Sequence, residues 1–196
     1  WLTQFFMTKK VRSRMSKPEF KGNVSIEEVK NFGMVTVKGN LSDNKVREII
    51  QSISGTQCPQ IGKISDGKKM SVGWMSTDEY AIFGETSDAI KLVDRIGSKL
   101  KKYDHLCLNM SDSRRCFHLK GKGWREVISK GTPANLSPKA FGKGVLRRTR
   151  IANVAVAIWS FNETEAFIIS MTSVSDFILE WLINASLETG RISYFS

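Results

Sequence analysis

The sequence predicts an α+β fold built from two similar halves, each with a strand, a helix, further strands and a second helix. Alternating apolar and polar residues mark the strands, and apolar residues spaced at helical intervals mark the helices. The same order of elements then returns: the Lys-Gly pair at Lys38 recurs at Lys120, an offset of 82 (120 − 38). Such elements favour a mainly antiparallel sheet with helices packed on it.

The first half opens with the strand predicted by "FGMVTVKG" (32–39), where valine and threonine alternate before a glycine. The helix predicted by "LSDNKVREIIQSI" follows, with Ser42 as its cap. Strands are expected around 69–74 and 79–83, and then a helix in "TSDAIKLVDRIGSKLKK" capped by Ser87. The residues expected to face the core are Val46, Ile49, Ile50 and Ile53 in the first helix and Ala89, Val93, Ile96 and Leu100 in the second.

The second half begins at "CFHLKG", which resembles "VTVKG" of the first half. A short helix, "WREVISKG", follows, and strands are expected at 146–151, 154–159 and 165–170. The helix in "TSVSDFILEWLINAS" repeats the position of the earlier "TSDAIKLVDRIGSKL", at an offset of 86 (172 − 86). Its expected inward residues are Val174, Phe177, Ile178, Trp181, Leu182 and Ala185. We expect a basic, mobile tail at 1–20, a first half at 21–104 and a second at 105–196, sharing a core as one compact unit.

The composition says more about the partners of the protein than about its fold. The chain carries 30 Lys and Arg residues against 19 Asp and Glu, a net charge of +11, which favours acidic partners. Its basic segments are scattered and lack an evident aromatic stacking platform, so nucleic-acid binding is not the expected function, although a basic RNA-binding module stays a rival. No apolar run reaches membrane-spanning length. Three cysteines without tight spacing are typical of a reduced compartment, and we expect a cytoplasmic protein.

Several motifs resemble sites of chemistry, but each fits a structural role better. "LKGKGWREV" could place a phosphate at a helix start, but its third glycine is missing, which favours a turn with positive φ at Gly121 and likewise at Gly39. Cys107, Cys116 and His118 lack the paired spacing of zinc sites. Asp78-Glu79 begins an apolar run, where no second functional group accompanies it. We therefore predict no catalytic, cofactor-binding or metal-binding residue in this chain.

The segment "LRRTRIANVAVAIW" places Arg147, Arg148 and Arg150 on a rigid strand. These arginines suit an acidic patch on a partner or a carboxylate-bearing ligand such as a folyl glutamate; the plainer alternative is an edge strand with solvated arginines. With Trp124 and Trp159 they form the predicted partner contacts, because arginine and tryptophan are enriched at interface hot spots.

Three stretches together, "GWMSTDEYAIFG", the run from "NMSDSRRCFHLKG" through "SPKAF" to "VAVAIW", and "FIISMTSVSDFILEWLINA", resemble the gamma subunit of heterotetrameric sarcosine oxidase. The resemblance implies the fold of the N-terminal, folate-binding part of aminomethyltransferases. This sequence departs from the family at Asn135-Leu136-Ser137, where the family tends to have Asp-Leu-His before Pro138.

The resemblance further implies a noncatalytic subunit with a role in assembly and stability. Its partners would be the alpha, beta and delta subunits, which would hold FAD, FMN, NAD, zinc and tetrahydrofolate. That complex demethylates sarcosine oxidatively to glycine, forms hydrogen peroxide and passes the one-carbon unit to tetrahydrofolate. A free-standing tetrahydrofolate-binding or one-carbon transfer protein and a subunit of N-methylglutamate dehydrogenase stay as alternatives.

Overall fold

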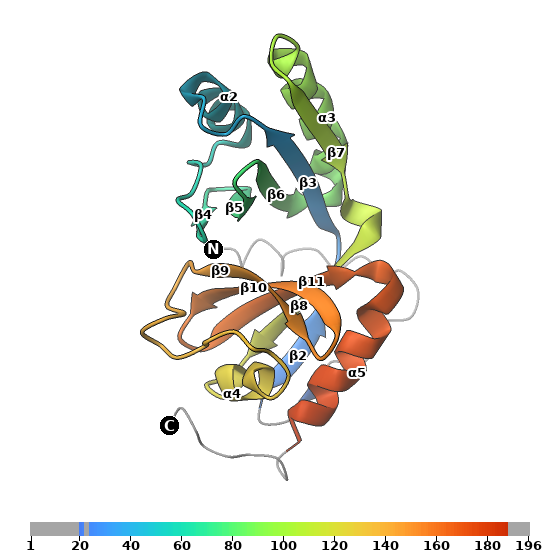
Figure 1. Ribbon diagram of the computed structural model, residues 1–196. Coiled ribbons are helices and arrows are strands. Elements are labelled where there is room, and N and C mark those ends of the chain that lie inside the picture. Colours follow the sequence, from blue (N-terminus) through green and yellow to red (C-terminus); the bar gives the residue numbers. More distant parts are fainter. Residues whose placement is uncertain (1–19, 22–23, 188–196) are drawn as a thin grey trace. The chain divides into compact units, whose positions relative to one another are not determined.

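Two structural units, each with its own sheet and helices, make up the computed structural model, which describes residues 20–21 and 24–187 (Figure 1). The first unit comprises Lys30–Asp112. The second comprises the described residues up to Val29 and those from Ser113 onward. The predicted tail falls outside the described residues except for its last residue, Phe20, which begins a strand. None of the described helices is long and apolar enough to cross a membrane.

The first unit has a five-stranded sheet in the order β4-β5-β6-β3-β7, in which all neighbouring strands are antiparallel. Its elements are β3 (Phe32–Gly39), α2 (Asn44–Ser54), β4 (Ile64–Asp66), β5 (Ser71–Ser76), β6 (Glu79–Glu85), α3 (Thr86–Leu100) and β7 (His105–Asn109). The side chains of Val35, Val37 and Ile82 on the sheet form one buried cluster with the inward stripes of both helices. The predicted strands and helices are therefore present.

Both predicted helix caps in this unit are wrong. Asp43, one residue after Ser42, caps α2 by accepting a hydrogen bond from the Lys45 amide at 2.8 Å. The helix α3 starts directly from the strand β6, with Glu85 at the cap position and no side-chain cap, so Ser87 lies inside the helix. Direct continuation from the strand decides where α3 begins.

The second unit has a six-stranded sheet in the order β1-β2-β8-β11-β10-β9, again antiparallel throughout. Its strands are β1 (Phe20–Lys21), β2 (Ser25–Glu28), β8 (Arg114–Lys120), β9 (Leu146–Ile151), β10 (Val154–Asn162) and β11 (Glu165–Met171). Its helices are α4 (Trp124–Ser129) and α5 (Ser175–Ala185), and short 3-10 turns occur at η1 (Ser111–Ser113) and η2 (Thr172–Val174). A buried cluster joins both helices to one face of the sheet.

The inward stripe of α5 differs from the prediction at two positions. Phe177 is 48% exposed, whereas Leu179 is buried with Ile178 and Leu182. The turn η2 precedes the helix, so Val174 lies at the cap of α5 rather than on its stripe. Trp181 packs beside Gly131, where an added Cβ would collide with the indole ring.

The two sheets repeat one strand order, as the internal repetition predicted: β4-β5-β6-β3-β7 corresponds to β9-β10-β11-β8-β2. The equivalent outer strands come from different places in the chain. β7 follows α3 and pairs with β3, so the expected boundary at residue 104 separates β7 from its own sheet. β2 precedes the first unit in sequence but pairs with β8. Pairing between strands that are distant in sequence therefore decides which strands belong to each unit. That the two halves share a core stays a prediction.

Candidate partner interface

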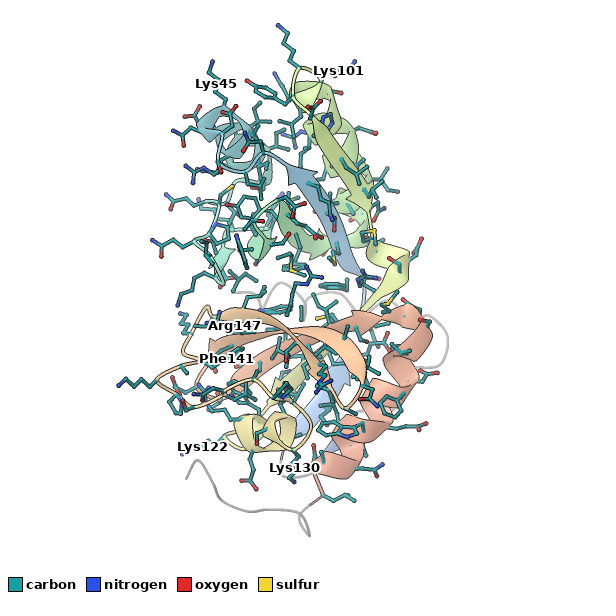
Figure 2. All side chains as sticks on the ribbon, in the orientation of Figure 1. Lys45, Lys101, Lys122, Lys130, Phe141 and Arg147 are labelled. Carbon is teal, nitrogen blue, oxygen red and sulfur yellow. The ribbon has the colours of Figure 1, made fainter. Side chains whose placement is uncertain are left out.

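The strand β9 lies at one end of the six-stranded sheet and carries the three predicted contact arginines. All three side chains are exposed, and Figure 2 shows Arg147 on this strand. Pairing with β10 places Arg147 opposite Ile158, Arg148 opposite Ala157 and Arg150 opposite Ala155. Because successive strand residues point to opposite faces, Arg148 and Arg150 share one face and Arg147 occupies the other. The arginines therefore form a pair and a single residue, not one cluster.

The two predicted contact tryptophans are buried. Trp124 is fully buried in the core of the second unit, where its Nε1 donates to the Glu163 carbonyl at 3.1 Å. Trp159 is also buried, with its ring stacked on Phe167 at a centroid distance of 5.0 Å. Both indoles pack against other side chains of this chain, so the structure does not support the prediction that they contact a partner directly. The apolar surface of both indoles is buried against residues of this chain.

A buried arginine, Arg125, organises the loop before β9. It is not among the contacts predicted from the sequence. Arg125, only 3% exposed, donates to the carbonyl oxygens of Leu136 at 2.9 Å and Phe141 at 2.8 Å. Its guanidinium lies 4.3 Å from the centroid of the Trp124 ring. Burial lowers the pKa of Arg125, and the nearby Glu163 carboxylate opposes that shift. The adjacent charges of Arg125 and Glu126 among the apolar residues of α4 are a signal that could have drawn attention to it.

A second polar cluster joins three strands of the same sheet. The His118 imidazole is buried between two carboxylates: Nδ1 lies 3.3 Å from Glu27 and Nε2 lies 2.7 Å from Glu165. Lys120 Nζ also contacts Glu27, at 2.6 Å. The hydrogen bond from His118, helped by Lys120 and opposed by burial, lowers the pKa of Glu27 to about 2. These contacts join β2 to β8 and β11, and both imidazole nitrogens are engaged in them.

The three cysteines are free thiols. Burial raises the pKa of Cys58 and Cys107 to about 11, and raises the pKa of the fully buried Cys116 as well. Cys107 lies on β7 of the first unit, whereas Cys116 and His118 lie on β8 of the second. Within the described residues, no three His, Cys, Asp or Glu side chains form a group that could hold a metal ion.

The Gly-x-Gly segment forms a turn. Gly121 has a φ of 135°, as predicted, and its amide donates to the Thr164 carbonyl at 2.8 Å. That amide is therefore engaged by protein, and α4 begins three residues later with only six residues. The prediction of a positive φ at Gly39 is wrong, since Gly39 is not among the residues with positive φ. An added Cβ there would lie 2.9 Å from the Asp104 carbonyl oxygen, so close approach of β7 requires the glycine.

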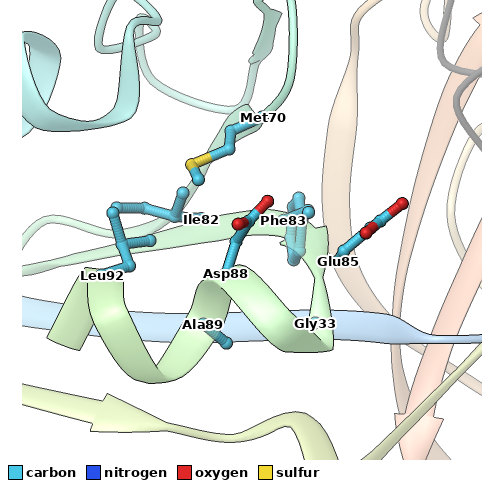
Figure 3. Close-up of a pocket in the computed structure, with 9 residues that line it drawn as sticks. Gly33, Met70, Ile82, Phe83, Glu85, Asp88, Ala89 and Leu92 are labelled. Carbon is cyan, nitrogen blue, oxygen red and sulfur yellow. The ribbon is translucent and has the colours of Figure 1, made fainter.

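A small recess lies in the first unit between β6 and the start of α3 (Figure 3). Its empty volume is about 160 Å³, and Met70, Phe83, Asp88 and Leu92 are among its lining residues. Ligand pockets usually occupy about 300–1,000 Å³. The recess is therefore too small to enclose a ligand as large as a folate.

Comparison with known proteins decides the family. The chain matches the model of the sarcosine oxidase, gamma subunit family over residues 38–188, which spans most of both units. The chain belongs to the sarcosine oxidase gamma-subunit family. The resemblance predicted from the sequence is confirmed.

Curated gamma subunits resemble this family member over much of their length. The gamma subunit of Corynebacterium sp. strain P-1 is 28% identical over 178 residues, covering 89% of this chain and 85% of the relative. The gamma subunit from Arthrobacter sp. is 30% identical over 138 residues, covering 68% and 66% respectively. Both units of the chain thus take part in the similarity.

Solved structures confirm the fold of this gamma-subunit family member. Heterotetrameric sarcosine oxidase from Corynebacterium sp. U-96, in complex with pyrrole 2-carboxylate, contains a chain that matches with a TM-score of 0.79 and 25% identity, covering 88% of this chain and 89% of that chain. Aminomethyltransferase T from Bartonella henselae matches with a TM-score of 0.59 and 12% identity, covering 83% and 46%. The second likeness concerns the fold alone and confirms the predicted aminomethyltransferase-like fold.

The segment 135–137 has a defined structural role. Asn135 Oδ1 accepts a hydrogen bond from the Ser137 amide at 3.0 Å, which forms a local turn. Leu136 is buried, and its carbonyl accepts from Arg125. In this gamma-subunit family member the segment serves to anchor the loop that leads to β9.

Proposed function

We propose that this chain is a noncatalytic gamma subunit that assembles with, and stabilises, the alpha, beta and delta subunits of a flavin-dependent sarcosine oxidase. The observation that carries the proposal is the family match over residues 38–188, together with the similarity of the whole fold to a chain of a heterotetrameric sarcosine oxidase. We place the complex in the cytoplasm.

The reaction of the complex would take place in the other subunits. There, sarcosine is oxidatively demethylated to glycine, hydrogen peroxide is formed, and the one-carbon unit passes to tetrahydrofolate. FAD, FMN, NAD, zinc and tetrahydrofolate would be bound by those subunits. This chain would provide a surface that binds the other subunits and would not take part in the chemistry.

The use of polar groups within the chain supports a noncatalytic role. The His118 imidazole is engaged by Glu27 and Glu165, and the Arg125 guanidinium by two backbone carbonyls. The raised pKa of Cys107 keeps its thiol protonated at neutral pH, so it is a poor nucleophile. His118 thus holds neighbouring strands together, and Arg125 holds the loop before β9.

The β9 arginines support an interface with an acidic surface. Arg148 and Arg150 share one face of a strand at the sheet edge, and the chain carries a net charge of +11. An acidic partner surface would be drawn to them, and charge complementarity chiefly sets specificity and the rate of association.

Co-expression with the alpha, beta and delta subunits tests the proposal. The 22.1 kDa chain should elute with all three in size-exclusion chromatography. The double variant R148E/R150E should weaken assembly by about ten-fold or more, whereas R95E, an exposed arginine on α3, should leave it unchanged. If the chain stays monomeric in the presence of its partners, or if the purified chain alone oxidises sarcosine with stoichiometric flavin bound, the proposal fails.

The fold likeness to aminomethyltransferase T favours one rival, a free-standing folate protein. Calorimetric titration of the isolated chain with tetrahydrofolate discriminates the two, because micromolar binding supports the rival. Activity of the assembled complex on N-methylglutamate in place of sarcosine would assign the chain to the related dehydrogenase.

A further inference from the structure

The four strands at the ends of the two sheets differ in how they resist pairing with another chain. Among the described residues, β1 has two residues and β4 has three, and β9 carries three arginines. Short length and charge are the usual ways in which proteins protect sheet edges. β7 has five residues, His105 to Asn109, and none of them is Lys, Arg, Asp or Glu.

The side chains of β7 add an exposed apolar surface to this edge. Leu106 is 48% exposed and Leu108 is 43% exposed. Between them, Cys107 packs against the core of the first unit, so alternation places both leucines on the face away from that core. Two neighbouring leucines on a strand at a sheet edge form a surface that a partner can cover.

The backbone of β7 offers hydrogen-bonding groups on its outer side. The Met110 amide donates to the Met34 carbonyl at 2.7 Å, and the Met34 amide donates to Ser111 Oγ at 3.2 Å, so the Met110 N–H points toward β3 and the backbone groups of Met34 point toward β7. Bonded and non-bonded pairs alternate along an antiparallel ladder, which makes Leu108 opposite Thr36 the next bonded pair. The N–H and C=O groups of Cys107 and Asn109 therefore point away from β3. Among the described residues, the sheet order ends at β7.

The second unit shows that this position in the fold accepts a further strand. β2 is the equivalent of β7, since each is the outer antiparallel neighbour of the first strand of its repeat. In the second unit β1 pairs with the outer side of β2, through Phe20 opposite Ile26 and Lys21 opposite Ser25. The outer side of β7 is thus the position in the repeat that corresponds to the one β1 occupies in the second unit.

The charges beside β7 indicate which occupant fits. Lys99, Lys101 and Lys102 are exposed at the end of α3 and in the turn that leads to β7, against one exposed carboxylate, Asp104. Figure 2 shows Lys101 extending from this turn. A second copy of a chain with a net charge of +11 would be repelled here, whereas an acidic segment would be attracted.

We propose that β7 accepts an extended segment of a partner subunit, with acidic and apolar side chains, as an added antiparallel or parallel strand. The backbone of Cys107 and Asn109 would bond the segment, Leu106 and Leu108 would cover its apolar side chains, and the lysines would face its acids. The inference rests on the proposed subunit function, because it names the surface through which a partner subunit is held.

The test compares assembly of the co-expressed complex with exchange of the β7 amides. The variant L106K/L108K should weaken assembly by about ten-fold or more. The control I90K changes another exposed apolar residue, 62% exposed on α3, and should assemble as the unaltered chain does. In the unaltered complex, hydrogen exchange at the amides of Cys107 and Asn109 should be at least about ten-fold slower than in the isolated chain.

The outcomes separate this inference from the proposed function. If the unaltered chain assembles but L106K/L108K assembles equally well, or the Cys107 and Asn109 amides exchange as fast as before, strand addition at β7 is overturned and the subunit function stands. If the unaltered chain fails to assemble, the proposed function fails and this inference fails with it. Self-association that L106K/L108K abolishes while assembly persists would assign the edge to a second copy and also overturn the inference.

Discussion

Replacing the buried Arg125 with methionine should destabilise the second unit and loosen the loop before β9. The guanidinium donates to two backbone carbonyls, Leu136 at 2.9 Å and Phe141 at 2.8 Å. Methionine fills similar space but donates no hydrogen bond. A hydrogen bond to a charged group contributes about 1.5–3 kcal/mol, and a buried acceptor left unpaired costs about 1–3 kcal/mol. We expect R125M to lower the free energy of unfolding by about 3–5 kcal/mol.

Two further variants separate the carbonyl contacts from the ion pair. Glu163 lies 3.5 Å from the Arg125 guanidinium, but its side chain is 74% exposed. E163Q should therefore cost less than about 1 kcal/mol, as exposed ion pairs do. R125K keeps a donor and should lie between E163Q and R125M. Comparable losses in E163Q and R125M would show that the ion pair, not the carbonyl contacts, matters.

Urea unfolding followed by circular dichroism measures the stability of each variant, and hydrogen exchange locates the change. The amides of Ala140 and Phe141 both donate to the Ser137 carbonyl, in the loop that Arg125 anchors. They should exchange faster in R125M than in E163Q. A loss of less than about 1 kcal/mol in R125M, with exchange at these amides unchanged, would refute the reasoning.

Two other substitutions test local features of the second unit. The pKa of Glu27 is lowered from 4.5 to about 2, so its carboxylate contributes stability that is fully present above pH 4.5 and is lost as the pH falls towards 2. E27Q should therefore lower the free energy of unfolding by about 1–2 kcal/mol at pH 7, a figure reduced because Glu27 is partly exposed. In urea unfolding the loss should be smaller at pH 3, and a loss independent of pH would contradict this. Ala152 has a φ of 50° in the two-residue turn between β9 and β10. A152G should raise stability by about 0.5–1 kcal/mol in thermal unfolding, whereas N153G, at a position without positive φ, should not; equal effects would refute the role of backbone strain.

Local periodicity was enough to predict most elements. The strands at 32–39 and 146–151 have the bounds that were expected, because alternation along a strand depends only on neighbouring residues. Most of the stripes of α2 and α3 were predicted for the same reason, but Leu92 of α3 is buried without having been predicted and the predicted Val93 is only partly buried. Helix starts were less predictable, since several residues near each start can cap it and the preceding strand decides which one does.

The candidate interface was predicted only in part. The exposed arginines of β9 follow from a charged run on a strand, and alternation along that strand already separates Arg147 from Arg148 and Arg150. The pairing with β10 adds which residues lie opposite them. The frequency of tryptophan at interfaces predicts Trp124 and Trp159 as contacts, but both side chains are buried in the structure. The leucines of β7 were not predicted, because no strand was expected at 105–109 and the sequence does not reveal which strand ends a sheet.

The sequence by itself determined the α+β class, the repeated order of elements, the basic charge and the resemblance to the gamma-subunit family, since these depend on residues close together in the chain or on the chain as a whole. Tertiary structure alone decided that β2 joins the second sheet and β7 the first, that His118 and Arg125 are held by distant partners, and which edges remain accessible. Each of these depends on contacts between residues far apart in sequence, and such contacts leave no local pattern from which they could be predicted.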